Sequence, residues 1–301
     1  MQSPARTGTE TPQSACRLCG GPTIARHRFA AHWVTYCRVC QLGQLAPMPT
    51  EQELAALYVS RKYFEGGGRA GYAGYAANAP QLARTFNTKL TCLLRHGPIH
   101  DLLEIGCGPG YLLDEARRAG IAAVVGVDPN PWAVEEARSR GLEVHAGSIE
   151  AVPPGRAFDA AVMLDLLEHV SDPLPFLRRV RERLRPSGRV LIMTPNIRSV
   201  LARVSGRRWV SFKIPEHVHY YSPRSVRRLL EGSGFEVISI RGSGQYVTVA
   251  FMLDRLSRLA PRLTAALAAA ARALAFESRV VFVTNGSMDV LARAVGGTRP
   301  A

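Results

Sequence analysis

The chain has 301 residues, room for one full-sized domain and a small one, and 47% of them are hydrophobic, which excludes an intrinsically disordered protein. Its 38 Lys and Arg residues outnumber 24 Asp and Glu residues, and the net charge of +14 leaves an anionic partner such as nucleic acid open. Only Lys62, Lys89 and Lys213 are lysines, so a lysine-rich binding tract is excluded and solvated arginines on helices are the simpler explanation.

Residues 1–14 are expected to form a disordered tail. They contain no charged segment followed by an apolar run, so we expect no signal peptide. The sequence also has no uncharged apolar stretch of about 18 residues, so we expect no transmembrane helix. A cytoplasmic protein follows from this, and in that compartment cysteines bind metals more often than they form disulfides.

Two CxxC pairs define a small domain over residues 15–47. Cys16 and Cys19 are separated from Cys37 and Cys40 by 17 residues. Four thiolates suit a tetrahedral Zn²⁺ ion, and a site with four protein ligands has no open position for catalysis. The spacing therefore predicts a structural zinc ribbon on a short hairpin. Such a ribbon could bind RNA, grip a substrate or hold a dimer together.

A linker and helical cap follow over residues 48–97. Thr50 to Glu53 has the sequence of a capping box, which predicts a helix start. Gly66 to Gly68 form a flexible break flanked by aromatic residues, which either close over a ligand or pack on the next domain. A second helix is expected over residues 78–94.

Residues 98–245 alternate strand-like and helix-like segments, the pattern of a parallel sheet with helices on both faces. Ligands of such sheets bind at the carboxyl ends of the strands, where the strand order reverses. We expect an α/β fold with a doubly wound, Rossmann-like sheet of seven strands. The strands are predicted at residues 101–105, 122–128, 142–146, 158–164, 189–194, 235–241 and 288–295.

The first of these strands leads into a glycine-rich turn, Gly106–Gly110, whose backbone can approach a ligand closely. Glu104 lies at the start of the turn and would repel a pyrophosphate, so a cationic ligand suits it better. Asp128 ends the next strand, where a carboxylate can accept both ribose hydroxyls. Together these residues predict a nucleoside with a cationic end, and S-adenosylmethionine fits this description.

Ordered segments of residues 101–241 are similar to the motifs of class I S-adenosylmethionine-dependent methyltransferases. The segments are Glu104–Gly110, Asp128, Phe158–Asp159, Leu167–Val170 and Leu184–Gly188. The resemblance implies that the glycine turn lines the methionine end of the cofactor, that Asp128 holds the ribose and that the last strand is antiparallel. The cofactor-binding residues implied in this way, the adenine neighbours Ser148 and Ile149 included, are Glu104, Gly106, Cys107, Gly108, Gly110, Asp128, Pro129, Ser148, Ile149 and Asp165.

The order of zinc ribbon, aromatic segment and methyltransferase domain resembles bacterial enzymes that modify small molecules, zinc-containing sugar C-methyltransferases among them. Residues 215–222 resemble a Glu-His-x-x-Tyr-Phe motif of that group. This chain is shorter and shows no second carboxyl-terminal domain, so a sugar nucleotide is one acceptor among others. The resemblance implies a sugar, quinone or natural-product acceptor in a biosynthetic reaction.

Histidines and acids after the fourth and fifth strands are the candidate catalytic residues. His217 is the first candidate for a base that activates the acceptor, because an imidazole accepts protons near neutral pH. His169 and Glu168 come second, since a pair at a helix start also suits a structural role. Asp165, Glu168 and His169 also resemble the Mg²⁺ motif of O-methyltransferases of ubiquinone synthesis and small-RNA modification, with His217 or His219 as a further ligand. A catalytic Mg²⁺ is the less favoured alternative.

Residues 246–278 are expected to form a helical insertion. Leucines between Leu253 and Leu274 recur at helical spacing, and Pro261 breaks or starts a helix. The insertion is predicted to be a lid or a dimer surface, with contact to a membrane as the minor alternative. Residues 279–301 then complete the last strand and end in a tail.

The lead hypothesis is a cytoplasmic S-adenosylmethionine-dependent methyltransferase that acts on a small molecule, with a homodimer left open. An RNA methyltransferase that grips its substrate through the basic ribbon is the second hypothesis. The charge supports it, and the lack of an aromatic-plus-basic strand motif weakens it. A non-catalytic cofactor-binding or scaffold protein is the third hypothesis. The intact Glu104, glycine turn and Asp128 argue against lost cofactor binding, but they do not prove turnover.

Overall fold

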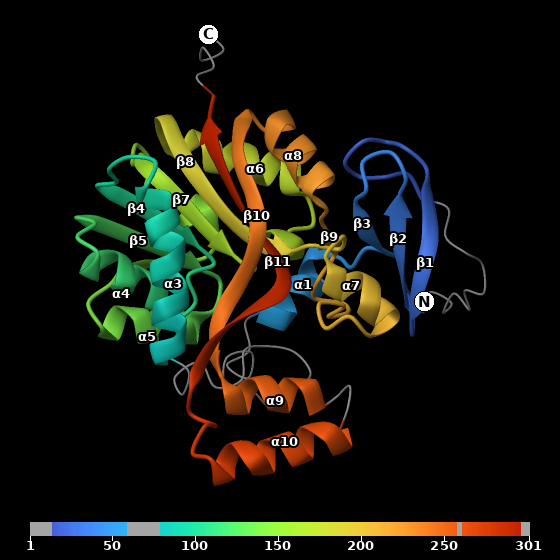
Figure 1. Cartoon of the computed structure of the whole chain (residues 1–301). Helices are drawn as coiled ribbons and strands as arrows, with labels where there is room; N and C mark the ends of the chain where they lie inside the picture. Colours follow the sequence, from blue (N-terminus) through green and yellow to red (C-terminus); the bar gives the residue numbers. More distant parts are fainter. Residues whose placement is uncertain (1–13, 59–78, 258–260, 296–301) are drawn as a thin grey trace.

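The computed structural model describes residues 14–58, 79–257 and 261–295, and it contains two β-sheets (Figure 1). The strands of the large sheet are β4 (Asp101–Ile105), β5 (Ala123–Asp128), β6 (Glu143–Ala146), β7 (Phe158–Leu164), β8 (Leu184–Pro195), β10 (Phe235–Thr248) and β11 (Val280–Ala294). Their order is β10-β11-β8-β7-β4-β5-β6. The strands β4 to β8 pair in parallel, and β11 is antiparallel to both of its neighbours. The expected α/β class, seven-stranded sheet and antiparallel last strand are confirmed.

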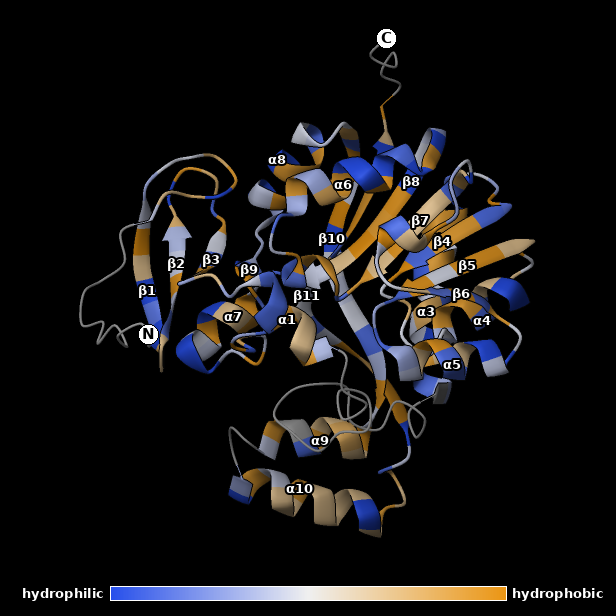
Figure 2. Ribbon diagram, turned by 180° about the vertical axis from the view of Figure 1, so that it is seen from behind, coloured by the Kyte–Doolittle hydropathy of each residue, from blue (hydrophilic) through white to orange (hydrophobic). Residues whose placement is uncertain are grey.

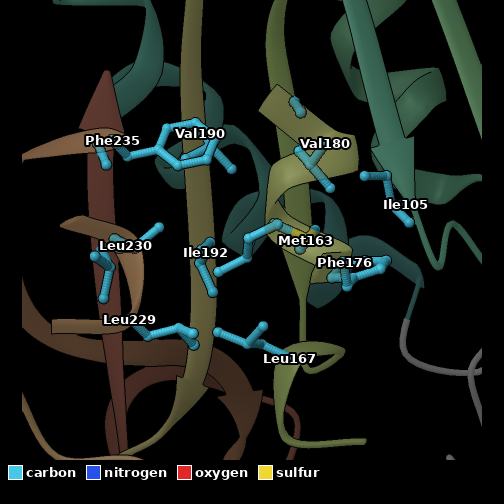
Figure 3. Packing of buried hydrophobic residues seen from close by; sticks show 14 of the residues in the cluster. Ile105, Met163, Leu167, Phe176, Val180, Val190, Ile192, Leu229, Leu230 and Phe235 are labelled. Carbon is cyan, nitrogen blue, oxygen red and sulfur yellow. The ribbon is translucent and has the colours of Figure 1, made fainter. Parts of the chain in front are cut away.

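Helices cover both faces of the large sheet. They are α3 (Ala79–Leu94), α4 (Tyr111–Arg118), α5 (Pro131–Ser139), α6 (Pro173–Glu182) and α8 (Pro223–Gly232). Successive side chains of a strand point to opposite faces, so Leu102 packs toward α3 and α4 while its neighbour Leu103 joins the layer of α6 and α8. Figure 3 shows that second layer, in which side chains from α6 and α8 surround Met163 and Ile192. Burial on both faces explains why the strands read as nearly continuous apolar runs.

The small sheet carries the cysteine pairs. Its strands are β1 (Thr23–Phe29), β2 (His32–Cys37), β3 (Gly43–Ala46) and β9 (His219–Tyr220), all paired antiparallel. The strand β9 comes from the large domain, and the Leu45 amide donates to the Val218 carbonyl at 2.9 Å beside it. Cys37 and Leu42 also share a hydrophobic core with Tyr221. The ribbon predicted over residues 15–47 is thus continuous with the large domain.

A short helix, α1 (Glu51–Tyr58), leads from the ribbon to the centre of the molecule. The predicted capping box is confirmed, since the Glu53 amide donates to Thr50 Oγ1 at 3.2 Å and the Thr50 amide donates to Glu53 Oε2 at 2.8 Å. Residues 1–13 of the expected tail and the aromatic segment around Gly66 to Gly68 lie outside the described residues.

The strands β10 and β11 are longer than the sequence pattern predicts. They stay paired beyond the end of β8, as far as Thr248 and Val280. Two helices, α9 (Val249–Ser257) and α10 (Pro261–Ala273), lie at the far end of this ladder. We call the described residues 244–257 and 261–284 the arm; Figures 1 and 2 show its helices projecting away from the body. Across the described ranges, no helix has both the length and the hydrophobicity needed to cross a bilayer.

Candidate functional site

A cleft opens at the carboxyl ends of β4, β5 and β7, the edge at which parallel sheets bind ligands. Gly106 and Gly108 of the turn after β4 have φ angles of 73° and 50°, a left-handed region that is strained for other residues. The amides of Gly106 and Cys107 both donate to the Val127 carbonyl, which holds the turn against β5. The lining residues are Tyr58, Phe86, Glu104, Gly106, Cys107, Gly108, Tyr111, Leu112, Asp128, Pro129, Asn130, Leu164, Asp165, Leu166, His169 and Val170.

Two buried carboxylates dominate the β4–β5 end of the cleft. Asp128 accepts hydrogen bonds from the Gly108 amide at 2.7 Å and from the Asn130 amide at 2.8 Å. Glu104 lies nearby with its Oε2 atom buried and without a hydrogen-bond partner. Burial, reinforced by the charge of Asp128, raises the pKa of Glu104 well above its usual range, and burial also raises the pKa of Asp128. None of the described lining residues is Lys or Arg, so this end suits a cation and not a polyphosphate.

A cluster of Glu168, His169 and His217 lies at the other end. One ligand atom from each of the three side chains lies within 4.8 Å of those of the other two. The imidazoles of His169 and His217 meet edge to face, with centroids 4.6 Å apart. Glu168 accepts from the Thr194 hydroxyl at 2.9 Å through Oε2, but its Oε1 atom and Nδ1 of His217 are buried without hydrogen-bond partners. Such atoms are costly to bury alone, so their proximity points to a bound group.

Burial sets the protonation of this cluster. It raises the pKa of Glu168 to about 8, lowers that of His169 to about 3 and lowers that of His217 well below its ordinary value. Both imidazoles are therefore neutral at pH 7. A neutral imidazole can accept a proton or bind a metal ion.

Most of the predicted cofactor residues line the cleft. Gly110, Ser148 and Ile149 do not: Gly110 precedes α4 and packs against Leu142, Ser148 hydrogen-bonds to Glu150, and Ile149 is part of the core. Their roles stay predictions. The predicted residues that do line it are Glu104, Gly106, Cys107, Gly108, Asp128, Pro129 and Asp165.

The predicted catalytic residues occupy two positions. His169 lines the cleft, whereas Glu168 and His217 are buried beside it and do not line it. Asp165 lines the cleft without belonging to the three-residue cluster, and His219 pairs its Nδ1 atom with the Val170 carbonyl at 3.0 Å. The base and ligand roles of these residues therefore stay predictions, with His169 the member of the cluster that a ligand in the cleft can reach.

Several lining residues have no role in the sequence-based prediction, Tyr58 and Asn130 among them. The Tyr58 hydroxyl lies 2.8 Å from His169 Nδ1. The side-chain amide of Asn130 donates to the backbone carbonyl of Tyr58 at 2.6 Å. Asn130 also accepts from the Ala133 amide at the start of α5, and Asn before Pro131 is a recognisable helix-capping signal. No local pattern identifies Tyr58, which is 111 residues from His169 in the chain.

The four ribbon cysteines form a second candidate site. The Sγ atoms of Cys16 and Cys40 lie 3.4 Å apart and those of Cys19 and Cys37 lie 3.5 Å apart, with all four within 4.8 Å of one another. Sulfurs about 2.3 Å from a tetrahedral zinc ion are separated by a similar distance. The hydrogen bond between Cys16 and Cys40 lowers the pKa of the Cys16 thiol and raises that of Cys40, so without a metal ion this pair shares a proton.

Comparisons with known proteins agree on one family. A family model described as a methyltransferase domain matches residues 73–240. The ubiquinone biosynthesis O-methyltransferase of Dinoroseobacter shibae is 32% identical over 154 residues, which cover 47% of this chain and 62% of that protein. The enzyme of the same name from Cereibacter sphaeroides is 30% identical over 175 residues, 54% of this chain and 70% of that protein. The first of these relatives is therefore matched over less than two thirds of its length.

The fold also occurs among solved structures. The crystal structure of the 4+2 cyclase SpnF matches with a TM-score of 0.52 and 21% identity, covering 83% of this chain and 99% of that one. At this identity the likeness describes the fold alone. A cyclase on the same fold shows that the reaction has to be argued from the site.

Proposed function

Because this chain belongs to the methyltransferase domain family, we propose that it transfers a methyl group from S-adenosylmethionine to a small-molecule acceptor. The observation that carries the proposal is one cleft with two ends. Glu104, whose Oε2 atom has no hydrogen-bond partner, lies with Asp128 at one end, and His169 of the three-residue cluster lies at the other. A cofactor and an acceptor can therefore meet inside the same cleft.

The cleft fits this cofactor by its charges. Glu104 offers a buried carboxylate oxygen without a protein partner, which suits the cationic methionine end. Asp128 is held in place by two amide hydrogen bonds, ready to accept the ribose hydroxyls. When bound, S-adenosylmethionine supplies a methyl group on a sulfonium, which an aligned nucleophile displaces. The chain's own contribution is to hold and align the reactants and to exclude water.

We propose a ring hydroxyl as the acceptor group, in line with the O-methyltransferase names of the relatives. Glu168, His169 and His217 would hold a divalent cation near it, because two of their ligand atoms are buried and unpaired. Two imidazoles and one carboxylate suit Mn²⁺ or Zn²⁺ better than Mg²⁺, which prefers oxygen ligands. A cation there would supply Lewis-acid stabilisation of the acceptor oxygen.

We further propose that Cys16, Cys19, Cys37 and Cys40 hold a structural zinc ion. The described sulfurs are close, free of disulfides and largely buried, which supports a closed four-thiolate site. The ribbon lies against the loop that carries His217, through the pairing of β3 with β9. Zinc would therefore stabilise part of the wall beside the cleft.

Methyl transfer from labelled S-adenosylmethionine tests the proposed function. The purified protein is expected to label a small-molecule fraction of host extract, or catechol-type acceptors added singly, and not the RNA fraction. Asp128→Ala serves as the inactive control, because it removes the ribose acceptor and leaves the Gly108 and Asn130 amides unpaired. Label in RNA, or binding of the cofactor without any transfer, would contradict the proposal.

The affinity for S-adenosylmethionine is expected to rise with pH. Burial and Asp128 raise the pKa of Glu104, so its protonated form persists to higher pH than in a solvated glutamate, while the cationic cofactor favours the carboxylate. At low pH, cofactor binding therefore releases the proton of Glu104. The affinity should rise with pH until Glu104 is already ionised in the free protein. Calorimetry between pH 5.5 and pH 8.5 measures this slope.

Glu104→Gln is the matched variant for this experiment. It keeps the size and polarity of the side chain and removes its charge. The dependence of cofactor affinity on pH should therefore flatten, and the affinity at high pH should fall by about tenfold, which corresponds to a shift of one pKa unit. A slope that is unchanged in Glu104→Gln would assign the pH dependence to another group.

A further inference from the structure

The arm leaves the molecule at the edge that carries the cleft. The strand β10 is antiparallel to β11, which is antiparallel to β8, so β10 runs in the direction of β4, β5 and β7. Its carboxyl end therefore points the same way as the strand ends that line the cleft. The helices α9 and α10 follow at that end, beyond the body of the sheet (Figure 1).

The helix α10 exposes an apolar stripe. Leu263, Leu267 and Leu274 are 62%, 47% and 77% exposed. At 100° per residue they lie within about 40° of one another on the helix surface. The residues of α10 that pack toward α9, Thr264 and Ala271, lie on the neighbouring side. The stripe is thus a face that contact with α9 leaves uncovered.

More apolar surface lies close to the stripe along the chain. Leu256 of α9 is exposed, as are Phe276 after α10 and Phe282 in the ladder. Figure 2 shows α10 coloured mostly as apolar, in contrast to the polar outer faces of the helices that cover the sheet. Exposed leucines and phenylalanines gathered on one projecting element favour a surface that meets a partner.

The arm is also basic. Residues 249–280 contain five arginines but only two acidic residues, Asp254 and Glu277. Among the described arginines of this segment, Arg262, Arg272 and Arg279 are exposed. Both acidic residues line the groove between α9 and α10, as does Arg272, and all three side chains are exposed. The arm therefore combines exposed leucine and phenylalanine with an excess of positive charge.

We propose that the arm docks on an anionic phospholipid surface, with the leucine stripe of α10 inserted at the level of the headgroups. Arg262 and Arg272 lie roughly 120° and 160° around α10 from the centre of the stripe. Leucines on one face of a helix and arginines on the opposite, polar face are the pattern of interfacial helices. A second copy of the chain is the other occupant considered; it would bring two net-positive faces together, whereas an anionic bilayer neutralises them. Docking in this way turns the cleft edge of the sheet toward the bilayer.

Vesicle flotation tests the proposal without reference to methyl transfer. The full chain is mixed with vesicles of phosphatidylcholine, or of phosphatidylcholine with 30% phosphatidylglycerol (roughly the range in which surface potential attracts basic segments). We expect at least about tenfold stronger partition onto the anionic vesicles, and weaker partition at 0.5 M salt because the charges are screened. Equal or absent binding to both vesicle types would overturn the proposal.

Two arm variants separate the apolar and the charge contributions. Leu263→Asn combined with Leu267→Asn and Leu274→Asn should lower partition by at least about tenfold. Arg262→Gln with Arg272→Gln and Arg279→Gln should lower it at low salt, and these exposed positions leave folding unaffected. Val200→Asn with Val204→Asn is the matched control, because both valines are exposed on α7 (Val200–Ser205) away from the arm.

Light scattering identifies the competing occupant. The proposal would be overturned if the wild-type protein has the mass of two chains, the leucine variant has the mass of one chain, and the wild-type protein does not bind vesicles. These results would assign the stripe to a second copy of the chain. A mass that is unchanged by the leucine variant, together with loss of vesicle binding, would support the bilayer.

Discussion

His217→Ala is expected to lower kcat for methyl transfer by about 10²–10⁴-fold, the range that a positioned acid–base group contributes. The His217 ring contacts the His169 ring, and its Nδ1 atom has no other partner. The variant therefore removes one member of the cluster and leaves the Glu104 and Asp128 end of the cleft intact. Single-turnover rates at saturating cofactor, measured beside the cofactor Kd, separate the loss of chemistry from a loss of binding.

The matched control is His96→Ala, at an exposed histidine outside the cleft. It should leave kcat unchanged, and thermal melts of both variants check that the fold is retained. Unaltered turnover in His217→Ala would remove His217 from the reaction altogether.

A further variant distinguishes a base from a metal ligand. Glu168→Gln keeps an acceptor for the Thr194 hydroxyl but loses the carboxylate charge. If the cluster binds a cation, both Glu168→Gln and His217→Ala should weaken Mn²⁺ binding by at least about tenfold, as losses of metal ligands and their neighbours do. A fall in kcat without any change in Mn²⁺ affinity would assign His217 to proton transfer and contradict the metal proposal.

Cys37→Ser is expected to have the largest effect on stability. A structural zinc ion contributes on the order of 10 kcal/mol in small zinc domains, so losing a ligand should cost several kcal/mol of unfolding free energy. The Cys37 sulfur is buried in a core shared with the large domain, so the damage should extend beyond the ribbon. Zinc content by mass spectrometry should fall by one ion per chain, and the melting temperature should fall with it.

Turnover should fall in the same variant. The Leu45 amide of the ribbon donates to the Val218 carbonyl, one residue from His217, so an unfolded ribbon releases the strand beside the cluster. Cys92→Ser is the control, because Cys92 is a half-buried thiol on α3 outside the four-cysteine cluster. Full zinc content and an unchanged melting temperature in Cys37→Ser would contradict the structural zinc site.

The chain sequence by itself determined the features that depend on neighbouring residues. The strands at Asp101–Ile105 and Phe158–Leu164 have the predicted bounds because continuous apolar runs mark strands buried on both faces. The capping box at Thr50 and the glycine turn after β4 were also predicted, since each satisfies a local hydrogen-bonding or φ requirement. The two CxxC pairs lie together as expected, because each forms on a tight turn and the β1–β2 hairpin between them brings the two turns side by side.

Only the tertiary structure decided how these parts meet. Tyr58 reaches His169, the His217 ring packs edge to face against His169 without lining the cleft, and β3 pairs with β9 of the other domain. The extra length of β10 and β11 likewise depends on each strand having the other as its partner beyond the end of β8. These contacts join residues that are tens to more than a hundred positions apart. Hydrophobic periodicity and turn chemistry act over a few residues, so they leave such pairings to the packing of the whole chain.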